Sequence, residues 1–277
     1  MPRKRLFVVR ILLIVSGVYL VCLVFISLAQ RRMMYFPCKT PARALEAEAT
    51  KEGFKPWRNA QGDAIGWHRP SAQAPAKRSV LVIHGNAGCA GDRFHYADAF
   101  QSIEPMDFYI LEYPGYGGRA GEPSQKTILH AAEDALKSIP GECPVFLMAE
   151  SLGTGVASFL AGAHPDRVGG VLLIAPYNNM TAVAQKHMPL FPVRAILRDK
   201  YPSSAWLSEY RGPVAVLLAG RDSIIPTELG RDLYDRYVGP KKLWIEPDLG
   251  HNDLHMPRDG TWQEVIEFWN STASERR

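Results

Sequence analysis

The sequence predicts an α/β domain with a mostly parallel central sheet, helices on both faces of that sheet, and a transmembrane helix before it. Three observations support this prediction. Short apolar runs alternate with segments of helical periodicity along most of the chain, which is typical of parallel strands joined by crossover helices. The apolar runs are continuous, which indicates strands buried on both faces. The first thirty residues contain a long stretch without charge.

Composition excludes several functional classes. The chain has 277 residues with 47% hydrophobic content, enough for one large core. Its net charge of +4 partly reflects basic residues near the N-terminus, so we expect no broad basic face and no nucleic-acid partner. The sequence predicts no metal site and gives no basis for an oligomeric state. Its cysteines show neither close pairing nor the CxxC spacing of zinc or redox sites; they are Cys22, Cys38, Cys89 and Cys143.

The N-terminal region is predicted to be a membrane anchor. A basic segment, 1–10, precedes an anchor at 11–30, whose uncharged residues 11–29 would cross the ~30 Å hydrocarbon layer as a helix. A cleaved signal peptide is the alternative, because Ser27 and Ala29 resemble a cleavage site. Basic residues flank the stretch almost equally, so the sequence predicts a single-pass membrane protein without fixing the side of the catalytic domain.

The remaining chain divides into a connector and one domain. Residues 31–52 mix proline, alanine and charge without strand periodicity, and 53–277 read as the folded domain. An exposed antiparallel strand is predicted at 64–70. Buried strands are predicted at 79–85, 107–115, 144–151, 167–176, 212–220 and 241–247, and helices at 93–103, 124–139, 151–165, 227–237 and 261–270.

One segment, 177–212, departs from this alternation. It is too long for an ordinary crossover, and prolines interrupt its apolar residues. Two interpretations remain open: a small cap over the site, or an irregular helix pair that packs on the sheet.

A serine stands where a predicted strand meets a predicted helix. In FLMAESLGTG, residues 146–155, an apolar run precedes Ser151 and a small-residue helical pattern follows it. Such a serine can simply cap the helix, or a tight strand-turn-helix can present it as a nucleophile. The small residues Ala149 and Gly153 fit the second interpretation, because that turn has no room for bulk.

The partners of a nucleophilic serine are found at two later strand ends. Asp222 follows the strand predicted at 212–220, and His251 follows the next strand. Parallel strands carry sites at their carboxyl ends, so we expect Ser151, Asp222 and His251 to form a catalytic triad. Asp222 alone would be read as a turn or capping residue. Asp248 and Asp253 compete for the role of the acid.

The glycine-rich loop after the first buried strand is the candidate oxyanion site. We assign the two donors to the backbone N–H groups of Asn86 and Leu152. A phosphate-binding loop is the alternative, but the Gly-Lys-Ser/Thr ending of a P-loop is missing from the sequence. His84 is expected to brace the loop and not to act as the base.

Taken in order, HGNAG, YPGYGGRAGEPS, AESLG, AGRDSIIP and GHND resemble motifs of the α/β-hydrolase superfamily. The likeness is strongest to its membrane-anchored bud-emergence-type branch, whose animal relatives include protein depalmitoylases. It covers about 31–270, including RRMMYFP after the anchor. It implies the α/β-hydrolase fold and a serine hydrolase with Ser151, Asp222 and His251 as triad. Ala149 departs from the glycine usual at the elbow, and the loop 113–117 is read as shaping the site.

The predicted activity is hydrolysis of carboxylic esters or thioesters through an acyl-serine intermediate, which needs no cofactor. The segment 187–197 is apolar enough to form a wall for an acyl chain, which favours a lipid-like or acyl-protein substrate held near the membrane. A small soluble ester is the alternative substrate. A serine peptidase and a non-catalytic membrane-tethered scaffold are the alternative functions.

Overall fold

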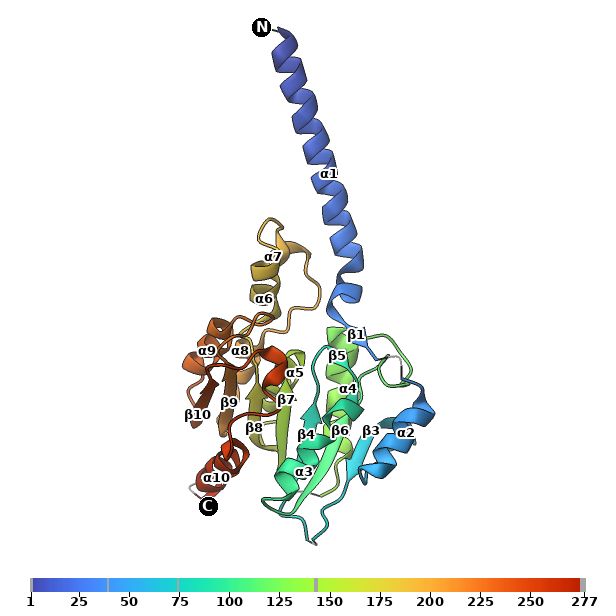
Figure 1. The fold of residues 1–277 in the computed structure, drawn as a ribbon, viewed down its shortest axis with the longest axis vertical. Coiled ribbons are helices and arrows are strands. Elements are labelled where there is room, and N and C mark those ends of the chain that lie inside the picture. The colour runs from blue at the N-terminus through green and yellow to red at the C-terminus, as the bar shows by residue number, and fades with distance from the viewer. Residues whose placement is uncertain (1, 39, 74, 142–143, 275–277) are drawn as a thin grey trace.

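A central sheet organises the domain. The computed structural model describes residues 2–38, 40–73, 75–141 and 144–274, and within these ranges the sheet has eight strands in the order β10-β9-β8-β7-β4-β6-β3-β2 (Figure 1). Strands β2 and β3 pair antiparallel, as do β3 and β6, and the other pairs are parallel. The mostly parallel α/β fold is therefore confirmed. The strands are β2 (Lys55–Arg58), β3 (Ala64–Arg69), β4 (Arg78–Ile83), β6 (Met106–Leu111), β7 (Val145–Glu150), β8 (Val168–Ile174), β9 (Val214–Ala219) and β10 (Lys241–Glu246).

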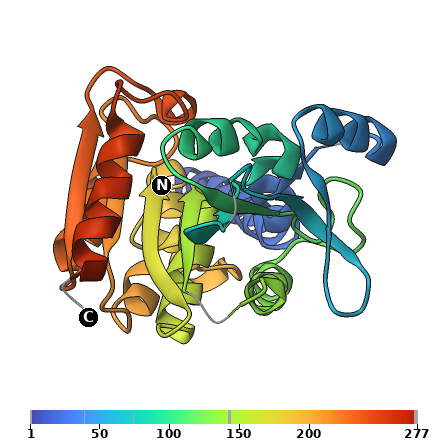
Figure 2. The same ribbon diagram turned by 90° about the horizontal axis from the view of Figure 1, so that it is seen from below.

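Helices cover both faces of the sheet, and Figure 2 shows the sheet between them. Strand β4 explains why the apolar runs are continuous: Leu81 and Ile83 enter one hydrophobic cluster, and Val80 and Val82 enter the other. Both faces of the strand are thus buried. The first cluster includes residues of α4 (Gln125–Ser138), α5 (Leu152–Ala163) and α9 (Thr227–Arg236), and the second includes residues of α3 (His95–Gln101) and α10 (Thr261–Ser274).

The range 31–52, predicted as a connector, contains regular structure. Helix α2 (Ala42–Lys51) packs on the domain through Leu45 and Ala49. Before it, β1 (Phe36–Pro37) pairs in parallel with β5 (Ala87–Gly88). The chain that leaves the N-terminal helix is therefore held against the loop that follows β4.

The N-terminal helix α1 (Pro2–Met34) stands out from the domain, as Figure 1 shows in blue. From Arg5 to Met34 the helix has the length and the apolar character needed to cross a membrane. Its lower part runs beside the hairpin of α6 (Met180–His187) and α7 (Val193–Ile196), which rises from the domain on the same side.

The segment 177–212 contains three short helices, α6 (Met180–His187), α7 (Val193–Ile196) and α8 (Ser203–Leu207). Helix α8 packs so closely on α5 that a Cβ at Gly162 would lie 2.1 Å from the Trp206 carbonyl oxygen. Helices α6 and α7 stand at the carboxyl edge of the sheet, beside α1. One half of the segment therefore lies over the predicted site, and the other half packs on the core.

Candidate active site

Ser151 occupies a strained turn between β7 and α5. Its φ of 49° and ψ of −120° lie in a region that residues other than glycine rarely adopt. A Cβ at Gly153 would lie 2.4 Å from the carbonyl oxygen of Ile83, so only glycine lets α5 start this close to β4. Ala149 is fully buried. This turn holds the Ser151 hydroxyl at the carboxyl edge of the sheet.

The three residues predicted as a triad meet at that edge. His251 Nε2 lies 3.0 Å from Ser151 Oγ, and His251 Nδ1 lies 2.7 Å from Asp222 Oδ2. The side chains of Asp222 and His251 are only 2% and 10% exposed. The imidazole thus bridges hydroxyl and carboxylate at hydrogen-bonding distance on both sides.

Asp222 has a second role in its own turn. Its Oδ1 accepts the backbone N–H groups of Ile224 and Ile225, at 2.9 and 2.7 Å. The same carboxylate therefore serves both interpretations: Oδ1 holds the turn, and Oδ2 faces the imidazole of His251. The competing acids have other partners: Asp248 pairs with an exposed arginine, and Asp253 accepts the N–H of a glycine in its own loop.

The residues predicted to supply the oxyanion donors lie beside Ser151. Leu152 is the first residue of α5, where a backbone N–H has no intrahelical acceptor. Asn86 is fixed through its other groups: its carbonyl accepts the Phe36 N–H at 2.8 Å and the Tyr116 hydroxyl at 2.7 Å. Its side-chain amide donates to the Met34 carbonyl at 2.9 Å. The end of α1 and strand β1 therefore hold this loop in place.

His84 lies beneath the same loop. Its ring is fully buried, with Nδ1 2.8 Å from the Gly85 carbonyl oxygen. The Tyr113 hydroxyl donates to the His84 carbonyl at 2.7 Å. His84 is thus placed to brace the loop. Tyr113 and Tyr116 support the loop through their hydroxyls, which agrees with a shaping role for the segment 113–117.

A buried ion pair next to Ser151 was not anticipated from the sequence. The Glu150 carboxylate accepts Arg93 Nε at 2.7 Å and also the Tyr96 hydroxyl. Burial by itself would raise the pKa of the Glu150 carboxyl, but the Arg93 guanidinium and the Tyr96 hydroxyl outweigh burial and lower that pKa below its ordinary value. No local pattern could reveal this pair, because its members are 57 positions apart.

Two cavities of different character meet at Ser151. An apolar cavity of about 280 Å³ extends between α1 and the α6–α7 hairpin. A second cavity, of about 580 Å³, is also lined by Ser151 and extends along His251. The apolar cavity is lined by Ile26 and Met33 of α1 and by Met180, Val183, Val193 and Ile196 opposite. The second cavity, here called the polar cavity, has a mixed lining: Phe36, Ile174 and Leu254 lie beside the polar side chains of Arg93, His95, Glu150, His251, Asn252 and His255.

Metal and disulfide sites are absent from the described ranges. These residues contain no cluster of histidine, cysteine and carboxylate side chains that could hold a metal ion. Cys22, Cys38 and Cys89 are free thiols, and Cys143 lies outside the described residues.

Comparison with known proteins identifies the family. The model of a family described as serine aminopeptidase S33 matches residues 74–206. The uncharacterized protein Rv2307c of Mycobacterium tuberculosis is 31% identical over 247 residues, which cover 87% of this chain and 85% of that protein. Lysophosphatidylserine lipase ABHD12 of Mus musculus is 28% identical over 256 residues, covering 80% of this chain and 63% of that protein.

A solved structure shares the fold. The esterase Pf2001 of Pyrococcus furiosus superimposes with a TM-score of 0.63 over 86% of this chain and 98% of the esterase, at 13% identity. The bud-emergence-type branch stays a prediction. Together with the observed fold, these matches show that the chain belongs to the α/β-hydrolase superfamily.

Proposed function

We propose that the protein is a membrane-anchored serine hydrolase that cleaves carboxylic esters or thioesters with an apolar acyl chain. One observation carries this proposal: His251 bridges Ser151 and Asp222 at the point where an apolar and a polar cavity meet. A nucleophile in this position can attack a carbonyl whose acyl chain lies on one side and whose leaving group lies on the other.

The first half of the reaction forms an acyl-serine. His251 Nε2 takes the proton of Ser151 Oγ as the oxygen attacks the carbonyl carbon, and Asp222 holds the imidazole in the required tautomer. The N–H groups of Asn86 and Leu152 stabilise the negative charge that develops on the carbonyl oxygen. The intermediate collapses, the bond to the leaving group breaks, and His251 returns its proton to the departing alcohol or thiol.

The second half releases the acid. A water molecule enters from the polar side, loses a proton to His251, and attacks the acyl carbon. The second intermediate expels Ser151 Oγ, which takes the proton back from His251. The products are a carboxylic acid and the free enzyme.

The two cavities support a division of the substrate. The apolar cavity matches a fatty acyl chain, and the side chains of Arg93, His95 and His255 give the other cavity a polar lining suited to a leaving group. The relative ABHD12 is named a lysophosphatidylserine lipase, and a lysophospholipid is an ester with a single acyl chain. An acyl-protein thioester presents the same chain to Ser151, so both belong to the proposed substrate class.

Helix α1 is proposed as an uncleaved anchor. Ile26 lines the apolar cavity, so cleavage after Ala29 would remove part of one wall. The helix therefore contributes to the site as well as to attachment. This combination favours a membrane location for the reaction.

A labelling experiment tests the nucleophile. The full-length protein in detergent should react with a fluorophosphonate probe, and Ser151→Ala should abolish the reaction. Ser208→Ala, at an exposed serine after α8, is the matched control and should label normally. A folded wild-type protein that does not label would favour the scaffold alternative.

A substrate panel tests the acyl chain. With p-nitrophenyl esters of increasing length, kcat/KM should rise from acetate toward long chains, because longer chains fill more of the apolar cavity. A preference for acetate would contradict the proposal.

A peptidase is the second candidate function, since the matched family model is described as serine aminopeptidase. Faster cleavage of aminoacyl arylamides than of esters would favour it.

A further inference from the structure

The loop between α6 and α7 packs against the apolar part of α1. Residues 188–193 carry no charge. The Tyr19 hydroxyl donates to the Leu190 carbonyl at 2.9 Å, and the Tyr19 ring stacks on Phe191 at 5.6 Å between centroids. The Leu190 side chain is nevertheless 81% exposed. A large apolar side chain is thus presented outward from a loop that touches the middle of the predicted membrane span.

The position of Tyr19 along α1 sets the depth of this loop. A helix rises by about 1.5 Å per residue, so Arg10 and Arg31 are about 32 Å apart, close to the ~30 Å hydrocarbon thickness. Tyr19 lies about 18 Å along the axis from Arg31, or about 14 Å deep if α1 tilts by as much as about 40°. If the two arginines mark the membrane surfaces, the tip of the α6–α7 loop lies inside the hydrocarbon.

Most backbone polar groups of the loop meet the condition that hydrocarbon imposes; among the described residues the N–H of Leu190 is the exception. In lipid, each backbone polar group needs a partner within the protein. Pro189 and Pro192 have no N–H to satisfy, and the hydroxyl of Tyr19 and the carbonyl of Leu190 satisfy each other. The N–H groups of Met188, Phe191 and Val193 donate to the carbonyls of Ala184, Met188 and Phe191, respectively. The Gln185 side-chain amide lies 3.4 Å from each of the carbonyl oxygens of Met188, Pro189 and Phe191. The Pro192 carbonyl accepts the N–H groups of Ala195 and Ile196.

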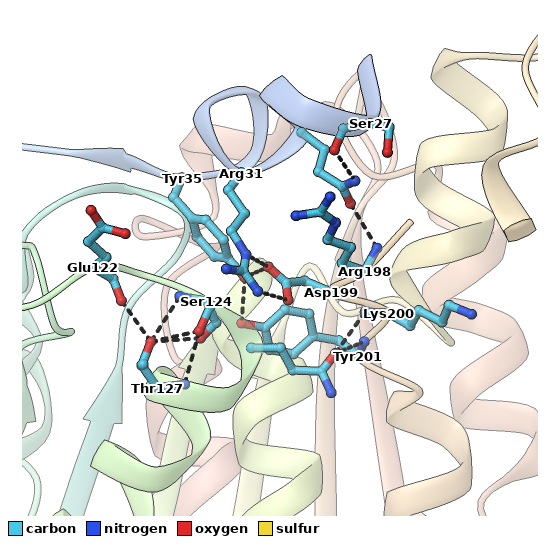
Figure 3. Close-up of polar contacts among 12 residues, drawn as sticks. Ser27, Arg31, Tyr35, Glu122, Ser124, Thr127, Arg198, Asp199, Lys200 and Tyr201 are labelled. Carbon is cyan, nitrogen blue, oxygen red and sulfur yellow. Dashed lines mark hydrogen bonds and ion pairs between the residues drawn. The ribbon is translucent and has the colours of Figure 1, made fainter. Parts of the chain in front are cut away.

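A second set of contacts ties the base of α1 to the same segment, as Figure 3 shows. Arg31 Nε pairs with Asp199 Oδ2 at 3.0 Å, and the Tyr35 hydroxyl donates to the same oxygen at 3.0 Å. The Gln30 amide donates to the Ile196 carbonyl at 3.1 Å. The apolar cavity that reaches Ser151 therefore lies along a helix and a hairpin that are joined both at Tyr19 and at 30–35.

We propose that residues 188–193 insert into the bilayer beside α1, and that the cavity between them takes the acyl chain of a membrane ester directly from the hydrocarbon. The chain then reaches Ser151 without crossing water, while the polar leaving group stays on the side of His251. Hydrolysis at Ser151 rests on the proposed function. Insertion of the loop rests on α1 as the membrane anchor and not on hydrolysis, so the two can fail separately.

A depth measurement tests the insertion. Leu190→Cys is prepared in a full-length protein whose native cysteines are replaced by alanine, labelled with an environment-sensitive fluorophore, and reconstituted into phosphatidylcholine vesicles. Val238→Cys is the matched control. Val238 is 75% exposed, and it precedes the amino end of β10, on the side of the sheet opposite the carboxyl ends where the α6–α7 hairpin stands. Lipids spin-labelled on the acyl chain should quench the label at position 190 at least twofold and leave the label at 238 unchanged. Equal quenching of both labels by aqueous iodide would overturn the proposal.

An activity measurement tests the route of the acyl chain. Leu190→Asp should lower hydrolysis of a long-chain ester presented in vesicles at least tenfold, while hydrolysis of a soluble short-chain p-nitrophenyl ester stays within twofold of wild type. Val238→Asp should preserve both activities. Unchanged vesicle hydrolysis in Leu190→Asp would contradict direct entry from the bilayer. A wild-type protein inactive on both esters would refute the proposed function, and the depth measurement would still decide the insertion.

Discussion

Replacing Glu150 by glutamine tests the buried ion pair next to Ser151. The Glu150 and Arg93 side chains are only 15% and 16% exposed, and Glu150→Gln removes the charge that faces Arg93 Nε at 2.7 Å. Breaking a buried pair costs about 3–5 kcal/mol, because the remaining charge stays buried without its partner. Asp92 Oδ2, 3.5 Å from Arg93 Nη1, provides a weaker substitute. We therefore expect a loss of about 3 kcal/mol in the free energy of unfolding.

The assay is thermal unfolding of both proteins in detergent. For a domain of this size a loss of 3 kcal/mol lowers Tm by about 6–12 °C. Asp248→Asn is the matched control: its pair with Arg221 is as short, at 2.6 Å, but the two side chains are 76% and 70% exposed. Exposed pairs contribute about 0–1 kcal/mol, so Tm should change by only about 4 °C or less.

The pH dependence gives a second readout. The pKa of Glu150 is lowered in the folded protein from 4.5, so its carboxylate stabilises the fold fully above that pH. This contribution is lost as the pH falls through the lowered pKa. The difference in Tm between wild type and Glu150→Gln should stay constant in neutral solution and narrow below pH 4.5. Equal shifts in Glu150→Gln and Asp248→Asn, or a gap that widens on acidification, would refute the reasoning.

Three further substitutions separate folding from catalysis. Asp222→Asn keeps an oxygen for the hydrogen bonds of its turn but presents an amide NH2 to the imidazole, so kcat should fall by about 10⁴-fold with Tm nearly unchanged. A large drop in Tm that accompanies the loss of kcat would contradict this separation. Gly153→Ala places a Cβ 2.4 Å from a β4 carbonyl oxygen, so circular dichroism should detect little folded protein, and a wild-type spectrum would count against the elbow geometry. Tyr116→Phe removes the 2.7 Å hydrogen bond to the Asn86 carbonyl; a loss of about 1 kcal/mol should lower kcat up to fivefold with KM unchanged, whereas a change confined to KM would argue against a role in oxyanion binding.

The sequence predicts the sheet well because its parallel strands are buried on both faces. A strand such as β4, with Leu81 on one side and Val82 on the other, leaves a continuous apolar run. Helix α2 gives no such signal, since among its side chains from Arg43 to Lys51 only Leu45 and Ala49 are buried. The two-residue pairing of β1 with β5 is too short for any pattern to reveal.

The residues of the site are predictable for a topological reason. Parallel strands end at one edge, so Ser151, Asp222 and His251 can be placed together from their positions after β7, β9 and β10. The Arg93–Glu150 pair depends on how α3 packs on the sheet, and nothing near either residue records it. The segment 177–212 stayed ambiguous because its prolines interrupt helical periodicity.

The pairing of β1 with β5 also has a mechanical consequence. One residue separates the end of α1 at Met34 from β1, and β1 pairs with β5, which directly follows Asn86. If α1 spans a bilayer as proposed, no flexible linker separates the domain from the membrane helix. Ser151 is then held at a constant height above the lipid. Under that proposal, esters whose scissile bond lies at this height above the membrane surface would reach Ser151 most readily.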